Sequence, residues 1–168
     1  MLAAQGVILA QGPDPTRSSR HVKAEFVASF LNFVEWPAAK LGTAPAQVIV
    51  AVLGDPDFAT LVREAAIHRP VGNRPISVQA ILEPDKARDA HLVFIGSSQA
   101  RRLPAILRSL SNASVLTVGD TDGFAQEGVA INLYTFDKRI RIEVNTTAAE
   151  RAGLRLSANL LRLARIVQ

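Results

Sequence analysis

The stretch that decides the fold is Gln47-Val48-Ile49-Val50-Ala51-Val52-Leu53-Gly54-Asp55-Pro56-Asp57. After Gln47, its first six residues are all apolar and mostly β-branched, which is typical of a parallel-sheet strand covered on both faces. The glycine, the proline and the two aspartates then predict a turn, and Asp57 is suited to cap a helix over 58–67. A strand–helix unit of an α/β protein therefore begins here.

Further strands and helices alternate along the chain after this unit. Apolar, β-branched runs predict three more strands, at 76–81, 92–95 and 115–118. Ser97 or Ser98 is expected to cap a helix that reaches Leu110, with Pro104 in its first turns. This alternation favours a largely parallel sheet with helices on its faces.

The pattern changes near the C-terminus, where two strands are expected at 129–136 and 139–144. Only Asp137-Lys138 separates them, and so short a polar connection predicts an antiparallel hairpin. The second strand alternates charged with apolar residues: Arg139, Arg141 and Glu143 with Ile140, Ile142 and Val144. One face of the hairpin is therefore expected to meet the core, and the other to meet solvent or a partner.

Helices are expected at both ends of this arrangement. Apolar residues at helical spacing predict a helix over Val22–Trp36, which Pro37 stops. Asn145 is expected to cap a short helix that ends at Gly153. A final helix is expected to bury the stripe Leu156, Leu160, Leu163 and Val167. The predicted fold is a three-layer α/β sandwich whose mixed sheet of about six strands, largely parallel with an antiparallel C-terminal hairpin, is flanked by helices.

The domain organisation follows from length and from the start of the chain. Residues 1–12 are mildly apolar, with no Lys or Arg before Arg17, and residues 1–20 are expected to be a signal remnant or a disordered tail. Residues 21–168 are expected to form a single domain. The 168 residues include no cysteine, which excludes disulfides and a thiol nucleophile. No apolar run approaches the roughly 18–20 residues that span a bilayer.

Motifs for catalysis are weak throughout the sequence. The chain has no G-x-G-x-x-G or P-loop, no G-x-S-x-G and no H-E-x-x-H. Asp120-Thr121-Asp122-Gly123 fits a turn better than a calcium loop. Ile95-Gly96-Ser97-Ser98 fits ordinary capping better than an anion site. We therefore expect no enzyme, no catalytic residue, no metal and no cofactor. With a net charge of +4 and 5% aromatic residues, a nucleic-acid partner is not expected either.

Several motifs, weak one by one, occur in a specific order: Phe30-Leu31-Asn32-Phe33-Val34-Glu35-Trp36-Pro37, Val52-Leu53-Gly54-Asp55-Pro56-Asp57-Phe58, Val71-Gly72-Asn73-Arg74-Pro75, Val93-Phe94-Ile95-Gly96, Leu116-Thr117-Val118-Gly119-Asp120, Ile142-Glu143-Val144-Asn145 and Ala152-Gly153-Leu154-Arg155-Leu156-Ser157. Through them the chain resembles the YfiR family over about Val22 to Val167. The resemblance implies a periplasmic regulatory protein that binds and represses an inner-membrane diguanylate cyclase. Cyclic di-GMP signalling and biofilm formation would fall as a consequence.

The same resemblance implies partners and an alternative. An outer-membrane peptidoglycan-binding lipoprotein would sequester the repressor, and the protein would be a homodimer. Family members carry disulfides, which this chain without cysteine cannot form. The alternative function is a periplasmic small-molecule sensor that acts on another membrane partner.

The resemblance also implies a small-ligand pocket between the end of the first helix and the Leu154–Ser157 turn. Its residues in this chain are Glu35, Trp36, Arg155 and Ser157. Glu35 and Arg155 either pair with each other or leave Arg155 free for an anionic ligand. Trp36 either anchors a partner or packs between helix and sheet.

A second set of binding residues is expected near the C-terminus. The spacing of Arg151, Arg155, Arg162 and Arg165 predicts that they share one helical face. This face is either a solvated stripe or a surface for acidic loops or anionic lipid headgroups. Charge reversal at Arg162 and Arg165 is expected to weaken cyclase binding and leave unfolding nearly unchanged.

Overall fold

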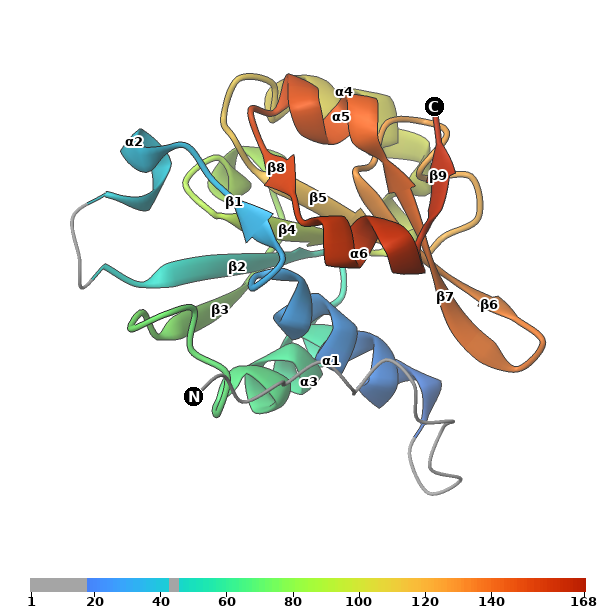
Figure 1. Cartoon of the computed structure of the whole chain (residues 1–168), viewed down its shortest axis with the longest axis horizontal. Helices are drawn as coiled ribbons and strands as arrows, with labels where there is room; N and C mark the ends of the chain where they lie inside the picture. Colours follow the sequence, from blue (N-terminus) through green and yellow to red (C-terminus); the bar gives the residue numbers. More distant parts are fainter. Residues whose placement is uncertain (1–17, 43–45) are drawn as a thin grey trace.

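A seven-stranded mixed sheet forms the middle layer of the protein, with helices on both faces (Figure 1). The computed structural model describes residues 18–42 and 46–168, so most of the segment expected to be a signal remnant or tail lies outside the described residues. The strand order is β3-β2-β4-β5-β6-β7-β9, and a separate two-stranded sheet pairs β1 with β8. The predicted α/β class, largely parallel with an antiparallel β6–β7 hairpin, is confirmed.

The strands are β1 (Val34–Glu35), β2 (Val48–Leu53), β3 (Ile76–Ile81), β4 (Leu92–Ile95), β5 (Leu116–Gly119), β6 (Ile131–Phe136), β7 (Arg139–Asn145), β8 (Arg155–Leu156) and β9 (Arg165–Val167). The α-helices are α1 (Ser19–Phe30), α2 (Ala38–Leu41), α3 (Pro56–Ala66), α4 (Leu103–Ser109), α5 (Thr146–Arg151) and α6 (Ala158–Leu163). Two 3-10 helices, η2 (Pro84–Ala87) and η3 (Ser97–Arg102), lie beside β4 in the sequence.

Strand β2 joins the two halves of the core. Val50 and Val52 lie in one apolar cluster with residues of α1 and α3. Ala51 and Leu53 lie in a second cluster with residues of α4 on the opposite face of the sheet. All four are at most 1% exposed. The run of apolar residues without polar alternation is therefore explained by two dry faces.

The chain winds outward from the centre of the sheet in both directions. Strand β2 pairs in parallel with β3 on one side and with β4 on the other. Helix α3 connects β2 to β3 and packs on one face, whereas α4 connects β4 to β5 and packs on the other. Crossovers of one hand that run in opposite directions place their helices on opposite faces. The carboxyl ends of β2 and β4 therefore form the switch point of the sheet.

The β6–β7 hairpin has the tight turn that the sequence predicted. Asp137 and Lys138 both have positive φ, 49° and 60°, as a two-residue type I′ turn requires. The register sets Phe136 opposite Arg139 and Tyr134 opposite Arg141. In Figure 1 the end of this hairpin projects from the body of the protein.

The first helix is shorter than predicted. It ends at Phe30 instead of continuing to Trp36, and the chain turns at Asn32 and Phe33. Residues Val34 and Glu35 then form β1, which is antiparallel to β8. The helical spacing of apolar residues was misleading here, because pairing with β8, 120 residues away, sets the backbone conformation of this segment.

The final helix was also predicted wrongly. Helix α6 covers only Ala158–Leu163, and Arg165–Val167 forms β9 in parallel with β7. Within the expected buried stripe, Leu160 is buried, but Leu163 is 55% exposed. The β-branched pair Ile166-Val167 extends the main sheet to seven strands, where about six were expected. The backbone N–H and C=O groups of Arg165–Val167 pair with the free edge of β7, instead of with each other in a longer helix.

Helix boundaries follow local chemistry with some corrections. Asp55, not Asp57, caps α3 by accepting a hydrogen bond from the Phe58 N–H, and Pro56 occupies the first turn. Ser98 does not cap its helix; its hydroxyl donates to the Gly54 carbonyl. The expected cap at Asn145 is confirmed by its bond from the Ala148 N–H.

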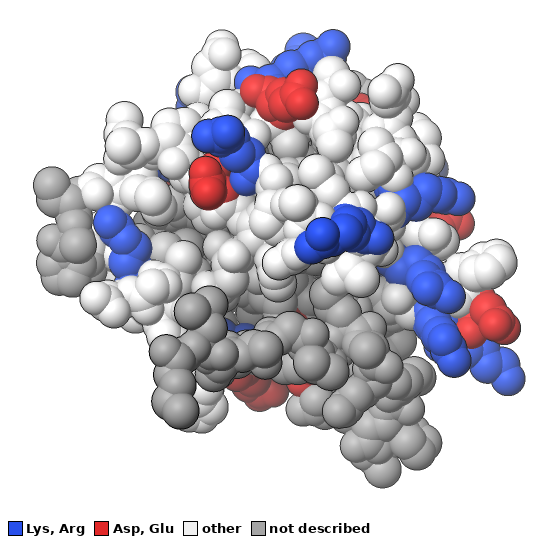
Figure 2. Space-filling model, in the orientation of Figure 1, with Lys and Arg blue, Asp and Glu red and all other residues white. Residues whose placement is uncertain are grey.

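On the face seen in Figure 2, several Lys and Arg side chains gather near the projecting hairpin of Figure 1, with an acidic side chain among them and further acidic side chains elsewhere on this view. Within residues 18–42 and 46–168, no helix has the length and apolar character needed to cross a bilayer.

The two dry faces of β2 lead to a stability prediction. Leu53→Ala should lower the free energy of unfolding by about 2–4 kcal/mol, since the fully buried side chain leaves a cavity between β2 and α4. Leu82→Ala, one residue beyond β3 and 79% exposed, is the matched control and should change it by less than about 0.5 kcal/mol. Urea denaturation of both variants measures the difference, and equal losses would contradict a two-sided core.

Candidate functional site

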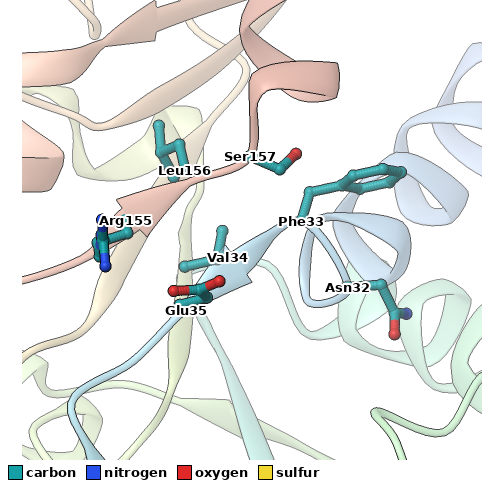
Figure 3. Close-up of a pocket in the computed structure, with 7 residues that line it drawn as sticks. All are labelled: Asn32, Phe33, Val34, Glu35, Arg155, Leu156 and Ser157. Carbon is teal, nitrogen blue, oxygen red and sulfur yellow. The ribbon is translucent and has the colours of Figure 1, made fainter.

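The two-stranded sheet of β1 and β8 borders a shallow hollow of about 290 Å³ (Figure 3). Its register sets Val34 opposite Leu156 and Glu35 opposite Arg155. The hollow is lined by Asn32, Phe33, Val34, Glu35, Arg155, Leu156 and Ser157. The structure therefore brings together three of the predicted pocket residues, namely Glu35, Arg155 and Ser157.

Glu35 and Arg155 lie on the same face of the small sheet, since residues directly opposite each other in an antiparallel pair share a face. Both are exposed, and within the described residues neither forms an ion pair with any partner. Of the two alternatives left by the sequence, internal pairing is thus not seen. One anionic and one cationic group stand side by side at the hollow with their charges open to solvent.

Ser157 connects the hollow to helix α6. Its backbone N–H donates to the Phe33 carbonyl at 2.8 Å, which holds β8 against the turn before β1. Its hydroxyl accepts from the Leu160 N–H at 3.2 Å and so caps α6. A group that bound at this serine would therefore act on the first turn of α6.

Trp36 takes no part in lining the hollow. The side chain is only 7% exposed, and its Nε1 donates to the His91 carbonyl at 2.9 Å. The indole meets the His91 ring edge to face, with centroids 5.9 Å apart. Of the two alternatives for Trp36, the structure thus shows packing in the core. The His91 carbonyl provides the hydrogen-bond partner that a buried indole N–H needs.

The surroundings of His91 disfavour its charged form. Its Nδ1 accepts from the Ile49 N–H at 3.0 Å, and its Nε2 lies 3.2 Å from the Lys40 carbonyl, to which it donates in this tautomer. Burial lowers the pKa of His91; the Lys40 carbonyl opposes this, and the positive charges of Lys40 and Arg74 add to it. Burial also lowers the pKa of Lys40, whose ammonium donates to the Arg88 and Ala113 carbonyls.

The predicted arginine face does not exist. Arg151 lies in α5, Arg155 in β8, Arg162 in α6 and Arg165 in β9, so the four residues belong to four elements. Arg162 is exposed and donates to Asn159 on its own helix. Arg165 instead pairs with Glu143, whose side chain is 4% exposed. The assumption of one continuous helix produced this error.

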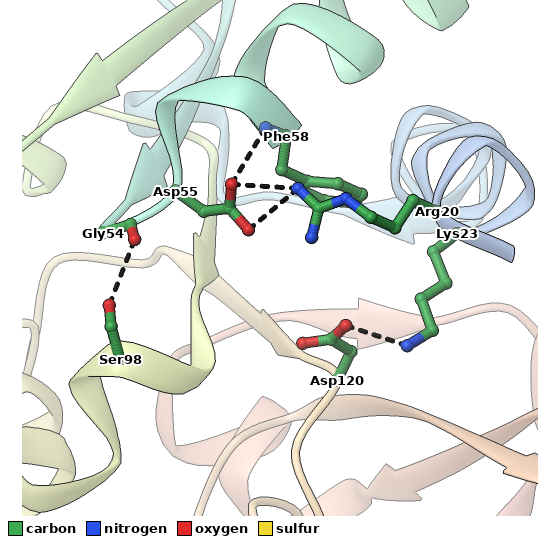
Figure 4. A network of polar contacts seen from close by, with 7 residues as sticks. All are labelled: Arg20, Lys23, Gly54, Asp55, Phe58, Ser98 and Asp120. Atoms are coloured by element: carbon green, nitrogen blue, oxygen red, sulfur yellow. Dashed lines mark hydrogen bonds and ion pairs between the residues drawn. The ribbon is translucent and has the colours of Figure 1, made fainter. Parts of the chain in front are cut away.

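A second polar network lies at the carboxyl edge of the sheet (Figure 4). Arg20 contacts both carboxylate oxygens of Asp55, at 3.0 and 3.1 Å, and Lys23 contacts Asp120 at 2.9 Å. The Arg20 guanidinium also lies 5.3 Å from the centroid of the Phe58 ring. The hydrogen bond to Asp55 raises the pKa of Arg20. Cations from α1 thus cover the switch point, where open α/β sheets commonly bind ligands.

This network was not predicted, although part of its signal is present in the amino-acid sequence. Asp120 follows buried strand β5 directly, Asp55 follows β2 after Gly54, and the carboxyl ends of parallel strands meet at one edge. The positions of Arg20 and Lys23 three residues apart on α1 place both cations on one helical face. For the part of the chain that the structure describes, no cluster of three or more His, Asp or Glu suited to a metal ion is found.

The environment of His91 predicts a pH dependence of stability. Because the folded-state pKa is lowered, the unfolded chain binds more protons below about pH 6.5, and the free energy of unfolding falls as pH decreases from there. Trp36, the only tryptophan, is buried against His91 and reports unfolding by fluorescence. His91→Gln should flatten the profile between pH 7.5 and about pH 5, relative to wild type.

His68→Gln is the control for this measurement, since His68 is exposed. Its profile should follow that of wild type. Two results would contradict a role of His91 in this pH dependence. One is a wild-type free energy of unfolding that does not decrease toward acid pH, and the other is an equal effect of both substitutions.

Comparison with known proteins places the fold and the family. A crystal structure of a conserved domain protein from Vibrio cholerae O1 biovar El Tor str. N16961 aligns with a TM-score of 0.64 at 12% identity, over 90% of this chain and 60% of that one. The ABC domain from Streptococcus pneumoniae, solved in complex with L-Trp, aligns with a TM-score of 0.57 at 10% identity, over 86% and 60%. This chain thus spans about three-fifths of each, and the likeness concerns the fold.

The family model described as YfiR/HmsC-like matches residues 20–165, from the second residue of α1 to the first residue of β9. This range contains the small sheet with its hollow, the covered switch point and the whole β6–β7 hairpin. The chain belongs to the DUF4154 family of YfiR/HmsC-like proteins.

Proposed function

We propose that the protein is a periplasmic regulator that binds the periplasmic portion of an inner-membrane diguanylate cyclase and represses it, lowering cyclic di-GMP. The observation that carries the proposal is the family match over residues 20–165, since the YfiR/HmsC-like family is regulatory and periplasmic. On this proposal the protein acts by occupying a partner's surface, and no bond is made or broken at its own groups.

The region around α6 is suited to such a contact. Arg162 and Leu163 are exposed on α6, and Ile166 is exposed on the adjoining β9. An arginine beside apolar side chains is typical of the residues that contribute most to protein interfaces. The hollow at Ser157 lies at the beginning of the same helix. Ligand-dependent control of this surface would need only a small movement of the helix cap.

The remaining partners follow from the same proposal. An outer-membrane peptidoglycan-binding lipoprotein that competes for this protein would relieve repression by mass action. A homodimer would present two copies of the α6 region to the cyclase. Light scattering of the purified protein, with and without the lipoprotein, tests both statements.

The central experiment is capture of the cyclase from solubilised membranes, followed by an assay of cyclic di-GMP synthesis with and without the protein. Wild type should capture the cyclase and lower its rate. Arg162→Glu should weaken capture about tenfold, since it reverses a charge at the proposed contact. The matched control is Arg101→Glu, an exposed arginine on η3. Equal capture by both variants would remove α6 from the interface, and no capture by wild type would refute the proposal.

The Arg165–Glu143 pair leads to a new expectation for a reversed charge at Arg165. Arg165→Glu would set a second carboxylate beside Glu143, which is buried. We expect its free energy of unfolding to fall by about 2 kcal/mol or more, whereas that of Arg162→Glu should stay within about 0.5 kcal/mol of wild type. Urea denaturation compares the two. Equal stability of both variants would show that the Arg165–Glu143 pair contributes nothing.

The hollow favours a second function, that of a small-molecule sensor. Glu35 and Arg155, side by side and unpaired within the described residues, match the ammonium and carboxylate groups of a small zwitterion such as an amino acid. The pneumococcal domain that shares this fold is described in complex with L-Trp. Calorimetric titration with L-amino acids tests this function. Glu35→Gln and Arg155→Gln should each weaken binding at least about tenfold, and an absence of any binding would refute it.

A further inference from the structure

One face of the β6–β7 hairpin alternates aromatic and basic side chains. Tyr134 lies opposite Arg141, and Phe136 lies opposite Arg139. Residues opposite each other in an antiparallel pair, and residues two apart on a strand, share a face. The basic residues of β7 therefore have aromatic neighbours that come from the preceding strand. Together with Lys138 of the turn, we call this set of five residues the hairpin face.

The base of the hairpin face is anchored by β9. Arg165 pairs with the buried Glu143, and its guanidinium lies 4.9 Å from the centroid of the Tyr134 ring. The basic residues nearer the turn differ from Arg165. Lys138, Arg139 and Arg141 are exposed, and within the described residues their side chains form no ion pair or hydrogen bond. The projecting hairpin therefore carries three exposed positive charges that are not neutralised by an ion pair within the described residues.

The order of these residues along the hairpin is informative. Phe136 is 64% exposed on the last pair before the turn, and Arg139 is its cross-strand partner. Arg141 is two residues farther back, about 7 Å at the usual rise of a strand. Because the hairpin end projects from the body (Figure 1), its apolar ring and its cations can approach a flat surface before the rest of the protein does.

This order matches the profile of an anionic bilayer surface. A large apolar side chain reaches the boundary with the acyl chains, while Lys and Arg remain among the phosphates a few ångströms above it. Anionic lipids attract basic segments near the surface, each Lys or Arg adding to the binding. The gathering of positive charge around the hairpin in Figure 2 is complementary to such a surface.

We propose that the β6–β7 hairpin is a membrane-docking element, in which Phe136 inserts at the lipid interface and Lys138, Arg139 and Arg141 contact anionic phospholipid headgroups. A bilayer is favoured over an acidic protein because Phe136 is exposed at the end of a ribbon, where a fluid surface accepts it without a shaped pocket. One ring and three cations give reversible docking, not permanent anchoring. The inference goes beyond the proposed function and does not require it.

Asp137 gives the proposal an internal check. It is exposed in the same turn and carries the opposite charge, so it opposes docking on an anionic surface. Asp137→Asn removes this repulsion and should increase binding, a change in the direction opposite to that of the other variants. Asparagine also tolerates the positive φ that the turn requires at this position.

The test is co-flotation of the full chain with protein-free vesicles of phosphatidylcholine alone or with about 30% phosphatidylglycerol. Wild type should bind only the anionic vesicles, and binding should fall steeply as salt rises from about 0.1 M to about 0.5 M. We expect Arg139→Gln with Arg141→Gln to lower the partition coefficient about twentyfold, Phe136→Ser about tenfold, and Asp137→Asn to raise it about fivefold.

Two matched controls keep the result interpretable. Leu82→Ser removes an apolar side chain that is 79% exposed beyond β3, at the opposite edge of the sheet. Arg101→Gln removes an exposed charge from η3. Both should bind vesicles like wild type, and circular dichroism should show all variants folded.

Three outcomes would overturn the proposal. The first is no binding of wild type to anionic vesicles, and the second is equal loss in hairpin and control variants. The third is unchanged vesicle binding by the hairpin variants with lost capture of the cyclase, which would assign the hairpin face to a protein partner. Because the vesicles contain no protein, failure of the cyclase proposal leaves this measurement unaffected.

Discussion

Strand β2 has no solvated face. Val50 and Val52 pack with α1 and α3, while Ala51 and Leu53 pack with α4 on the other side of the sheet. A strand buried in this way must have every backbone group paired, and β3 and β4 provide the pairs on its two edges. The placement of both helical layers, and of the switch point between β2 and β4, follows from that burial.

The switch point shows how the protein departs from other open α/β sheets. Ligands commonly bind there, outside the carboxyl ends of the strands. Here α1 crosses that edge, where Arg20 forms an ion pair with Asp55 and Lys23 forms one with Asp120. The binding surfaces that we propose lie elsewhere: the hollow between β1 and β8, the exposed side of α6 and the hairpin face. Helix α6 and the hairpin follow the central parallel strands in sequence, whereas the hollow combines β8 with β1, which precedes them.

The hollow and α6 are joined by Ser157, which lines the one and caps the other. Glu35 and Arg155 stand open at the same place, so a bound zwitterion would meet the cap of the helix that we propose as a contact for the cyclase. Repression and small-molecule sensing are therefore compatible in one structure. The hairpin face extends from the part of β7 that pairs with β9, and on our proposal it would hold the protein close to the membrane in which the partner resides.

The amino-acid sequence by itself determined the central strands, the hairpin with its turn at Asp137 and Lys138, the cap at Asn145 and the α/β class. These features depend on neighbours in the chain, on burial patterns and on turn chemistry. It also brought Glu35, Arg155 and Ser157 together, but only through the family resemblance.

Only the tertiary structure decided that Val34–Glu35 and Arg165–Val167 are strands, that Trp36 is buried on His91, and that the four arginines lie on four elements. The physical reason is that these positions depend on partners far away in the chain. A short strand forms where a distant segment satisfies its backbone hydrogen bonds, and local periodicity carries no information about that segment.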